Sequence, residues 1–309
     1  MRKIVVIGMV VLALVAISFV GSWYSQSQVN DTSRVSMNKT NPARSDFENA
    51  RSLTLPSHLE FAGETVPLDD PDVRERLDRE LHINTYWHTN TILMIKRANR
   101  WLPMIAEELK RDSIPDDFKY IVAIETNFKN DTSPRGAVGF WQFVKDAAVE
   151  KGLEVDDEVD ERYDPVKSTR AAADYLKHAY EKFGSWTMAA ASYNRGVTGM
   201  VNAIEHQKER DYYKLMLNEE TSRYVFRILA AKMVLEDPEK YGYDVQPQHL
   251  YAPFETHEVE VTESIPSLVD WSIDHGITFR QLKRYNPWIQ SDQLTITNGK
   301  TYTIQLPNT

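Results

Sequence analysis

Glu125 is the residue whose type and position in the chain point most directly to chemistry. It completes the i, i+3, i+4, i+7 helical stripe that begins with Phe118, Ile121 and Val122. The carboxylate is therefore expected on the buried face, near the C-terminal end of its helix. Desolvation and the negative helix end both disfavour the ionised form, so the pKa of Glu125 should rise. A carboxylic acid that stays partly protonated near neutral pH suits a general acid. The alternative is a structural Glu that reaches solvent or pairs with an arginine such as Arg135.

The segment after Glu125 combines glycines with an amide side chain. Residues 133–142 read Ser-Pro-Arg-Gly-Ala-Val-Gly-Phe-Trp-Gln, and the two glycines permit tight turns and a close approach of the backbone to a ligand. Gln142 offers both a donor and acceptors, which suit sugar hydroxyl and acetamido groups. Further on, Tyr193 and Asn194 place an aromatic ring beside an amide, another combination suited to saccharides. The alternatives are a core tyrosine and, at Gly196, a helix C-cap.

A helical domain is expected to position these residues. Apolar residues recur at helical spacing from about residue 72 to 250. Helices are predicted over 89–111, from just after Pro115, and over 169–183, 186–203 and 219–235. Pro103 either kinks the first of these or starts a second helix. Strand-like alternation is absent until about residue 257.

In order, four motifs resemble those of the lytic transglycosylases of glycoside hydrolase family 23, most closely the membrane-bound murein transglycosylase D type. The motifs are Glu125-Thr126-Asn127-Phe128, Ser133-x-x-Gly136-Ala137-x-Gly139-x-x-Gln142, Tyr193-Asn194-x-Gly196 and Glu220-Thr221-x-Arg223-Tyr224-Val225. The similarity covers roughly residues 75–240. It implies a mainly α protein with a lysozyme-like helical catalytic domain.

The resemblance also implies a mechanism in which Glu125 is the single catalytic acid and base. It would protonate the glycosidic oxygen between N-acetylmuramic acid and N-acetylglucosamine. It would then take a proton from the muramic C6 hydroxyl, which closes onto C1 as a 1,6-anhydro ring. The substrate's acetamido group replaces the second carboxylate of most glycosidases. The matching substrate-binding positions are Ser133, Gln142, Tyr193, Asn194, Glu220 and Tyr224.

The sequence departs from the family pattern at three places. Thr126 stands where Ser is common, Phe140-Trp141 where Leu-Met is common, and Arg195 where a small residue is common. Arg195 could narrow the groove or contact a peptide carboxylate. Two other functions stay open at this point: a hydrolytic muramidase, in which water replaces the C6 hydroxyl, and a catalytically silent peptidoglycan-binding protein.

Composition excludes several other classes. The 309 residues include no cysteine and carry a formal net charge of −9. Thiolate nucleophiles, Cys-ligated metals, disulfides and a lipid-modified cysteine are therefore excluded, and the acidic balance argues against nucleic acid as a partner. The histidines form no His-x-x-x-His pair beside a Glu, and no metal or cofactor is expected. The acidic run from Glu154 to Glu161 is predicted to be a solvated loop, with a calcium site as the alternative.

The N-terminus predicts export. Arg2 and Lys3 precede an uncharged, mostly apolar run from Ile4 to Tyr24, which as a helix would span roughly 30 Å, the thickness of a bilayer core. Residues 1–24 are interpreted as a retained signal anchor, with a cleaved signal peptide or a buried core helix as alternatives. Residues 25–70 are expected to be a tether. The partners expected are peptidoglycan glycan strands and the membrane, on the periplasmic side of a bacterial cell envelope.

A transglycosylase domain is predicted over 71–250 and a second, small domain over 251–309. Apolar residues alternate at 257–261 and again at 302–306, and two short helices, 265–275 and 278–285, are expected between them. This βααβ order resembles a LysM glycan-binding domain. The family's Gly-Asp-Thr-Leu start is replaced by Ile265-Pro266-Ser267-Leu268, so glycan binding and a purely structural cap on the catalytic domain both stay open.

Overall fold

The computed structural model describes residues 51–297 and 299–308. The predicted signal anchor, residues 1–24, lies outside the described residues, as does the first part of the predicted tether. Among the helices that are described, none combines the length and the apolar character needed to cross a bilayer.

The described chain begins with a segment that packs on the helical domain. Strand β1 (Glu60–Phe61) pairs antiparallel with β2 (Glu64–Thr65), and the side chains of Phe61, Val66 and Leu68 are buried. Strands of two residues are too short to show an alternation of apolar and polar residues. The sequence therefore predicted no strand before residue 257. The predicted tether, 25–70, therefore includes a packed segment, and we propose that the folded domain begins before residue 60.

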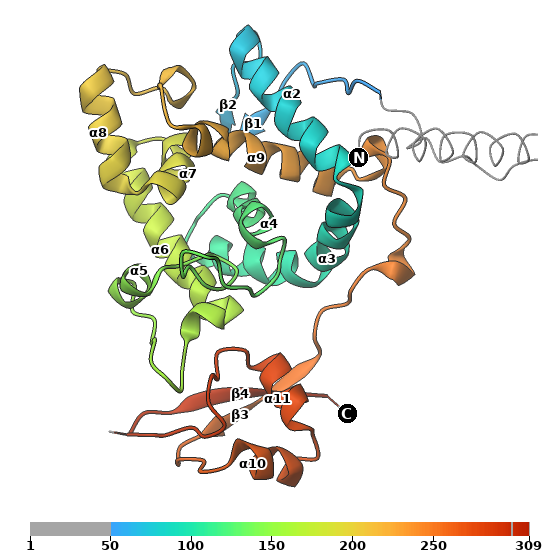
Figure 1. The fold of residues 1–309 in the computed structure, drawn as a ribbon, viewed down its shortest axis with the longest axis vertical. Coiled ribbons are helices and arrows are strands. Elements are labelled where there is room, and N and C mark those ends of the chain that lie inside the picture. The colour runs from blue at the N-terminus through green and yellow to red at the C-terminus, as the bar shows by residue number, and fades with distance from the viewer. Residues whose placement is uncertain (1–50, 298, 309) are drawn as a thin grey trace, which may run out of the picture. The chain divides into compact units, whose positions relative to one another are not determined.

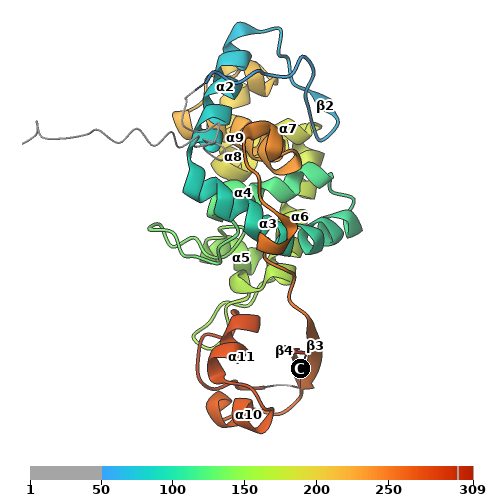
Figure 2. The same ribbon diagram turned by 90° about the vertical axis from the view of Figure 1, so that its right-hand side faces the viewer.

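The helical domain then follows the predicted order (Figure 1). Its helices are α2 (Pro71–Tyr86), α3 (His88–Arg111), α4 (Ile121–Thr126), α5 (Lys145–Glu150), α6 (Pro165–Phe183), α7 (Trp186–Arg195), α8 (Val197–Gln207) and α9 (Glu219–Glu236). The short helix α4 lies in the middle of this domain and packs against α9 (Figures 1 and 2). Helices dominate the region, as the spacing of apolar residues predicts, and loops such as residues 127–144 separate them. The helix predicted from just after Pro115 begins as a 3-10 helix (Asp116–Tyr120) and continues as α4.

Polar caps and special backbone positions set the helix limits. Asp70 and Asp164 accept backbone N–H bonds at the starts of α2 and α6, each followed directly by a proline in the first turn. The single helix predicted over 186–203 is wrong, because Gly196 (φ 80°, ψ 148°) ends α7 and precedes α8. The C-cap alternative for Gly196 is thereby confirmed. Pro103 lies inside α3 and does not start a new helix.

The C-terminal domain has the predicted βααβ order. Strand β3 (Thr256–Val261) pairs antiparallel with β4 (Tyr302–Pro307), with Val259 opposite Ile304. Helices α10 (Leu268–Asp274) and α11 (Phe279–Tyr285) lie between the strands in sequence and pack against each other. Buried side chains from all four elements form the core, among them Leu268, Leu282 and Ile304.

The acidic run 154–161 is not the solvated loop that was expected. Val159 is buried in the core of the C-terminal domain, and the backbone N–H of Asp160 donates to the carbonyl of Trp288 (2.8 Å). The Glu158 carboxylate accepts from the backbone N–H and the hydroxyl of Thr295 (2.7 and 3.0 Å). The partners of this run come from residues more than 120 positions further along the chain, so local composition could not reveal them.

Candidate active site

A groove of about 750 Å³ crosses the helical domain, and Glu125 is among its lining residues. Two helices give it polar walls. On α2 the lining residues are Glu80, Ile83 and Asn84, followed by Trp87 directly after the helix end, and on α9 they include Glu220, Arg223 and Arg227. Both sets follow the i, i+3, i+4, i+7 spacing that places side chains on one helix face. The groove is thus lined by one face of α2, one face of α9 and the end of α4.

The end of α4 is fixed directly after Glu125. The helix stops at Thr126 because Asn127 and Phe128 both adopt left-handed backbone conformations, each with φ 53°. The Asn127 amide donates to the side-chain oxygen of Asn90 (2.6 Å), and the Arg97 guanidinium donates to the Asn127 carbonyl (3.3 Å). Both partners lie on α3, so contacts with α3 hold the C-terminal end of α4, next to Glu125, in place.

The environment of Glu125 favours its protonated form. Burial is the main cause and raises the pKa of Glu125, and the nearby charge of Glu220 acts in the same direction. Two groups oppose this rise: the Tyr224 hydroxyl, which donates to Glu125 Oε1 at 2.5 Å, and the positive charge of Arg227. The predicted direction is therefore confirmed. Arg135, the alternative ion-pair partner, is exposed, and Tyr224 is the hydrogen-bonding partner of Glu125.

The glycine-rich loop contributes two of the predicted residues to the groove lining. Ser133 and Gln142 both line the groove. The Ser133 hydroxyl accepts the Ala137 N–H (3.0 Å), and the Gln142 amide donates to the carbonyls of Gly139 (2.8 Å) and Asp131 (3.1 Å). The NH₂ group of Gln142 is thus engaged within the loop itself.

Close packing from behind holds this loop. A Cβ atom at Gly139 would lie 1.9 Å from the carbonyl oxygen of Arg162, so only glycine fits there. The Arg162 guanidinium forms a buried ion pair with Asp160 (2.7 Å) and donates to the carbonyls of Gly136 (3.4 Å) and Phe143 (3.3 Å). Nothing in the local sequence marks Arg162 as a support for the loop.

The other predicted residues lie around the groove in different ways. Glu220 lines it. Asn194 does not: its amide donates to Glu220 Oε1 (3.2 Å), and its side-chain oxygen accepts from the Thr221 hydroxyl (2.8 Å). Tyr193 does not line the groove either. Its hydroxyl donates to the carbonyl of Trp141 (2.7 Å). Tyr224 is fully buried and contacts Glu125 from below the groove. Of Tyr193, Asn194, Glu220 and Tyr224, only Glu220 is exposed and lines the groove.

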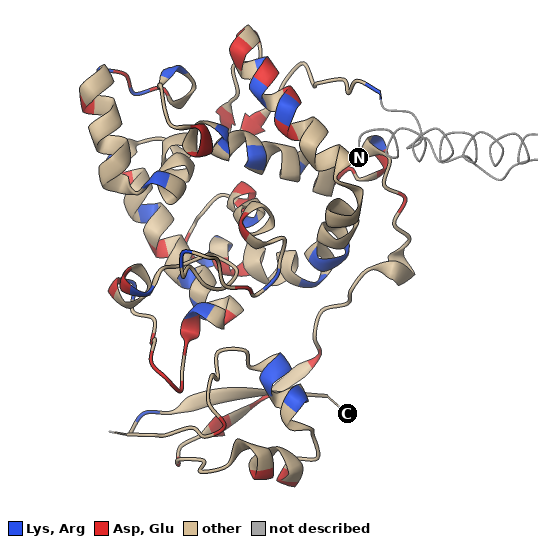
Figure 3. Cartoon of the chain, in the orientation of Figure 1, with Lys and Arg blue, Asp and Glu red and all other residues tan. Residues whose placement is uncertain are grey.

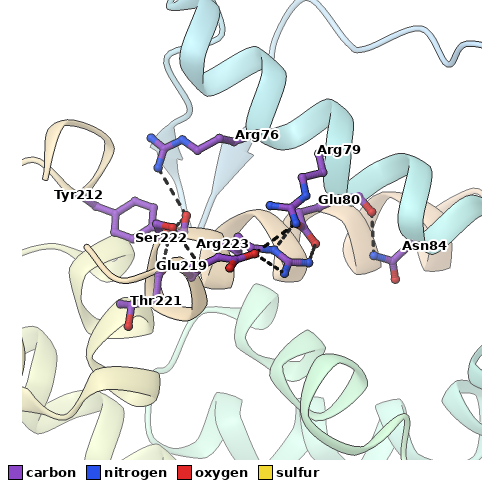
Figure 4. A network of polar contacts seen from close by, with 9 residues as sticks. All are labelled: Arg76, Arg79, Glu80, Asn84, Tyr212, Glu219, Thr221, Ser222 and Arg223. Atoms are coloured by element: carbon purple, nitrogen blue, oxygen red, sulfur yellow. Dashed lines mark hydrogen bonds and ion pairs between the residues drawn. The ribbon is translucent and has the colours of Figure 1, made fainter. Parts of the chain in front are cut away.

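An ion-pair network that the motifs did not indicate joins the two helical walls (Figure 4). The Arg223 guanidinium on α9 contacts both carboxylate oxygens of Glu80 on α2, at 2.6 and 3.2 Å. Glu80 is only 1% exposed, so the carboxylate of this ion pair is shielded from solvent. Glu219 accepts more weakly from Arg79 and Arg223, at 3.3 and 3.4 Å. The regular spacing of polar residues on α2 and α9 was the signal that could have identified this network.

Trp87 is a second groove residue that sequence reasoning missed. It lies between α2 and α3 and is 62% exposed. Its ring forms no aromatic pair with another described residue, and it lines the groove beside Asn90. An exposed indole at the edge of a groove provides a flat apolar surface for a ligand. Within the described residues, no group of three His, Asp or Glu side chains could hold a metal ion.

Comparisons with known proteins agree with this geometry. Residues 103–216 match the family described as transglycosylase SLT domain, and residues 257–309 match the soluble lytic transglycosylase C-terminal LysM-like domain. The membrane-bound lytic murein transglycosylases D of Escherichia coli strains K12 and O6:H1 are each 27% identical over 252 residues, and the match covers 76% of this chain and 52% of the relative. A putative tributyltin chloride resistance protein of Alteromonas sp. (strain M-1) is 28% identical over 116 residues, 37% of this chain and 56% of that protein. The chain thus spans about half the length of these relatives.

Proposed function

We propose that this chain, which carries a transglycosylase SLT domain followed by a LysM-like C-terminal domain, is a peptidoglycan lytic transglycosylase. Its reaction would cleave the β-1,4 bond between N-acetylmuramic acid and N-acetylglucosamine and leave a 1,6-anhydro-muramic end. The observation that carries the proposal is a single protonatable carboxylate, Glu125, held by Tyr224 at the lining of an open groove.

The other carboxylates of the groove are poorly suited to act as a second catalytic group. Glu80 is committed to Arg223, and Asp131, Glu219 and Glu220 are exposed. Glycosidases that use two carboxylates need the pair at a set separation across the scissile bond. One desolvated acid without an obvious partner favours a mechanism in which the substrate supplies the second group.

The proposed mechanism uses Glu125 twice. As an acid, Glu125 gives its proton to the glycosidic oxygen while the bond to the muramic C1 breaks and the acetamido oxygen assists at C1. The carboxylate that results is stabilised by the hydrogen bond from Tyr224 and the charge of Arg227. As a base, it takes the proton of the C6 hydroxyl, whose oxygen then bonds to C1 as the acetamido oxygen leaves C1. Glu125 ends the reaction protonated, as it began, and no water is consumed.

The remaining groove residues are proposed to position the glycan. Ser133, Gln142 and Glu220 offer polar atoms along the groove lining, and Trp87 offers a ring surface. Asn194 and Tyr193 act indirectly in this proposal: Asn194 orients Glu220, and Tyr193 holds the backbone before Gln142 through the carbonyl of Trp141. Neither protein side chains nor a metal need to form a covalent bond with the sugar.

The proposal places the enzyme in the bacterial envelope, where its substrate lies. The apolar run 4–24 is proposed to tether it to the membrane, a role that rests on the sequence because the run lies outside the described residues. The LysM-like domain is proposed to bind the same polymer as the groove. Removing residues 1–24 and following the protein between membrane and soluble fractions tests the tether. A soluble truncated form and a membrane-bound full chain are expected, and a full chain in the soluble fraction would contradict the tether.

Turnover of purified sacculi tests the enzymatic proposal. Wild type should release soluble muropeptides, and Glu125→Gln, which keeps the shape but has no proton to give, should release almost none. Glu107→Gln is a matched control, because Glu107 is an exposed carboxylate on α3 outside the groove lining. Equal release by wild type and Glu125→Gln would reject Glu125 as the acid. Intact sacculi with both would instead favour a binding protein without catalytic activity.

A further inference from the structure

A second cavity, of about 460 Å³, lies where the C-terminal domain meets α3 and the start of α6. Its walls come from α3, α11, the connector at 253–254 and the β3–β4 sheet. The two domains are joined around it by backbone bonds, including Asp160 N–H to Trp288 O and Gln290 N–H to Glu158 O, both 2.8 Å. The proposed catalytic mechanism makes no use of this cavity.

Two arginines in this cavity face one aromatic ring. The guanidinium carbon of Arg100 lies 4.4 Å from the centre of the Phe254 ring, and that of Arg284 lies 5.3 Å from the same centre. Arg100 comes from α3 and Arg284 from α11, so each domain contributes one cation; Figure 3 shows basic residues on both helices. Burial lowers the pKa of Arg100, and the positive charge of Arg284 lowers it further. The positive charges of the two guanidinium groups therefore repel each other.

No carboxylate of the described residues balances this pair. Neither Arg100 nor Arg284 forms an ion pair among residues 51–297 and 299–308. The acidic residues of the cavity are engaged elsewhere: Asp164 caps α6 by accepting from Val166 and Lys167, and Glu258 accepts from Gln305.

The remaining basic side chains of the cavity are already paired. Arg170 binds Glu108 (2.6 Å), and Lys167 binds Glu161 (2.5 Å). In a chain of net charge −9, two guanidinium groups without a carboxylate partner in one recess favour the binding of an anion.

The walls of the cavity indicate what kind of anion fits. The Phe254 ring contacts Trp101 and Tyr285 edge-on, with ring centres 5.5 and 4.9 Å apart, and Trp288 completes an aromatic lining. A small, fully hydrated anion gains little from such a surface, whereas a carboxylate attached to apolar groups fills it. Guanidinium groups also match the planar geometry of a carboxylate.

We propose that Arg100 and Arg284 bind a carboxylate of the peptide stem that muramic acid carries in peptidoglycan. This inference rests on the proposed function, because it takes peptidoglycan as the polymer that the chain engages. The hydroxyl and acetamido groups of the sugars carry no charge, so the stem is the part of the polymer that supplies carboxylates beside short apolar side chains. The site would make the enzyme sensitive to the presence of stems at a position outside the catalytic groove.

Calorimetric titration of the full chain carrying Glu125→Gln tests this site without turnover. The probes are a free stem tetrapeptide, the same peptide with its carboxylates amidated, and a peptide-free chitooligosaccharide. The tetrapeptide should bind, the amidated form should bind at least tenfold more weakly, and Arg284→Met and Arg100→Met should each weaken the tetrapeptide at least tenfold. Arg280→Met is the matched control: it removes an exposed cation from the same helix outside the cavity lining and should leave the affinity unchanged.

Three results would overturn the assignment: equal affinity of both peptide forms, unchanged affinity in both arginine variants, or inorganic phosphate binding as tightly as the tetrapeptide. Arg100 also donates to the carbonyl of Ala252 (2.8 Å), so Arg284→Met, at an exposed position with no such bond, is the cleaner variant. Release of muropeptides from stem-bearing sacculi by wild type is measured in parallel and is the readout for the proposed function itself: release without tetrapeptide binding rejects only this site, whereas absence of release from sacculi rejects the proposed function.

Discussion

Tyr224→Phe removes one oxygen atom from beneath the proposed catalytic acid. The hydroxyl donates to Glu125 Oε1 at 2.5 Å from a fully buried position, so no water can take its place without repacking. This bond favours the ionised carboxylate that exists after Glu125 has given up its proton. A hydrogen bond to a charged group contributes about 1.5–3 kcal/mol, so the loss should lower kcat about 10- to 150-fold.

The same substitution should move the pH profile in a defined direction. Glu125 must be protonated to start the reaction, so the fall of activity at high pH reports its ionisation. Without the Tyr224 donor, the ionised form is less stable and the pKa of Glu125 rises further above its usual range. Activity of Tyr224→Phe should thus persist to higher pH than that of wild type, although its maximum is lower. Release of soluble muropeptides from sacculi, measured across the pH range, provides both quantities.

Tyr212→Phe is the matched control for this prediction. Tyr212 is also buried, but its hydroxyl donates to the carbonyls of Thr221 and Ser222 (2.9 and 2.7 Å) at the start of α9 (Figure 4). Its loss should lower stability and leave the pH profile of activity in place. A Tyr224→Phe enzyme with the kcat and the pH profile of wild type would refute the assigned role of the Tyr224–Glu125 bond.

Three further predictions concern the groove and its supports. Trp87→Ala should raise KM for glycan strands about 10- to 150-fold with little change in kcat, because an aromatic surface contributes about 1.5–3 kcal/mol when a ligand covers it; a loss confined to kcat would contradict a binding role. Arg223→Met leaves Glu80 buried without a partner, which should cost about 3–5 kcal/mol and lower Tm by roughly 6–20 °C, whereas the double variant Glu80→Met/Arg223→Met should recover much of the loss in thermal unfolding. Gly139→Ala should destabilise the protein far more than Gly136→Ala: both glycines have φ near 78°, but only at residue 139 would the new Cβ meet a backbone oxygen. Equal unfolding free energies for the two glycine variants would show that the loop is not held against Arg162.

The sequence predicted those features of the fold and the site that depend on a local pattern of residues. Helical spacing predicted the helical region and the raised pKa of Glu125, and alternation predicted both strands of the C-terminal domain. It failed at Gly196, where one backbone conformation divides a helix that apolar spacing alone would continue.

Contacts between distant segments were beyond the reach of local patterns. The pairing of Glu80 with Arg223 joins residues 143 positions apart, and Val159 enters the core of a domain that begins about a hundred residues later. Motif order also could not separate residues that line the groove, such as Gln142, from those that support it, such as Tyr224. That distinction depends on which way each side chain points, and this is set by tertiary packing.

The mass of the glycan ends released from sacculi in water enriched with heavy oxygen tests the central claim most directly. If Glu125 deprotonates the C6 hydroxyl, the new muramic ends are 1,6-anhydro rings, which lack the mass of one water and carry no heavy oxygen. Hydrolysis would instead produce reducing ends that are heavier by one water and have incorporated the label. Unlabelled anhydro ends from wild type, absent with Glu125→Gln, are the result predicted here; labelled reducing ends would contradict the transglycosylase mechanism.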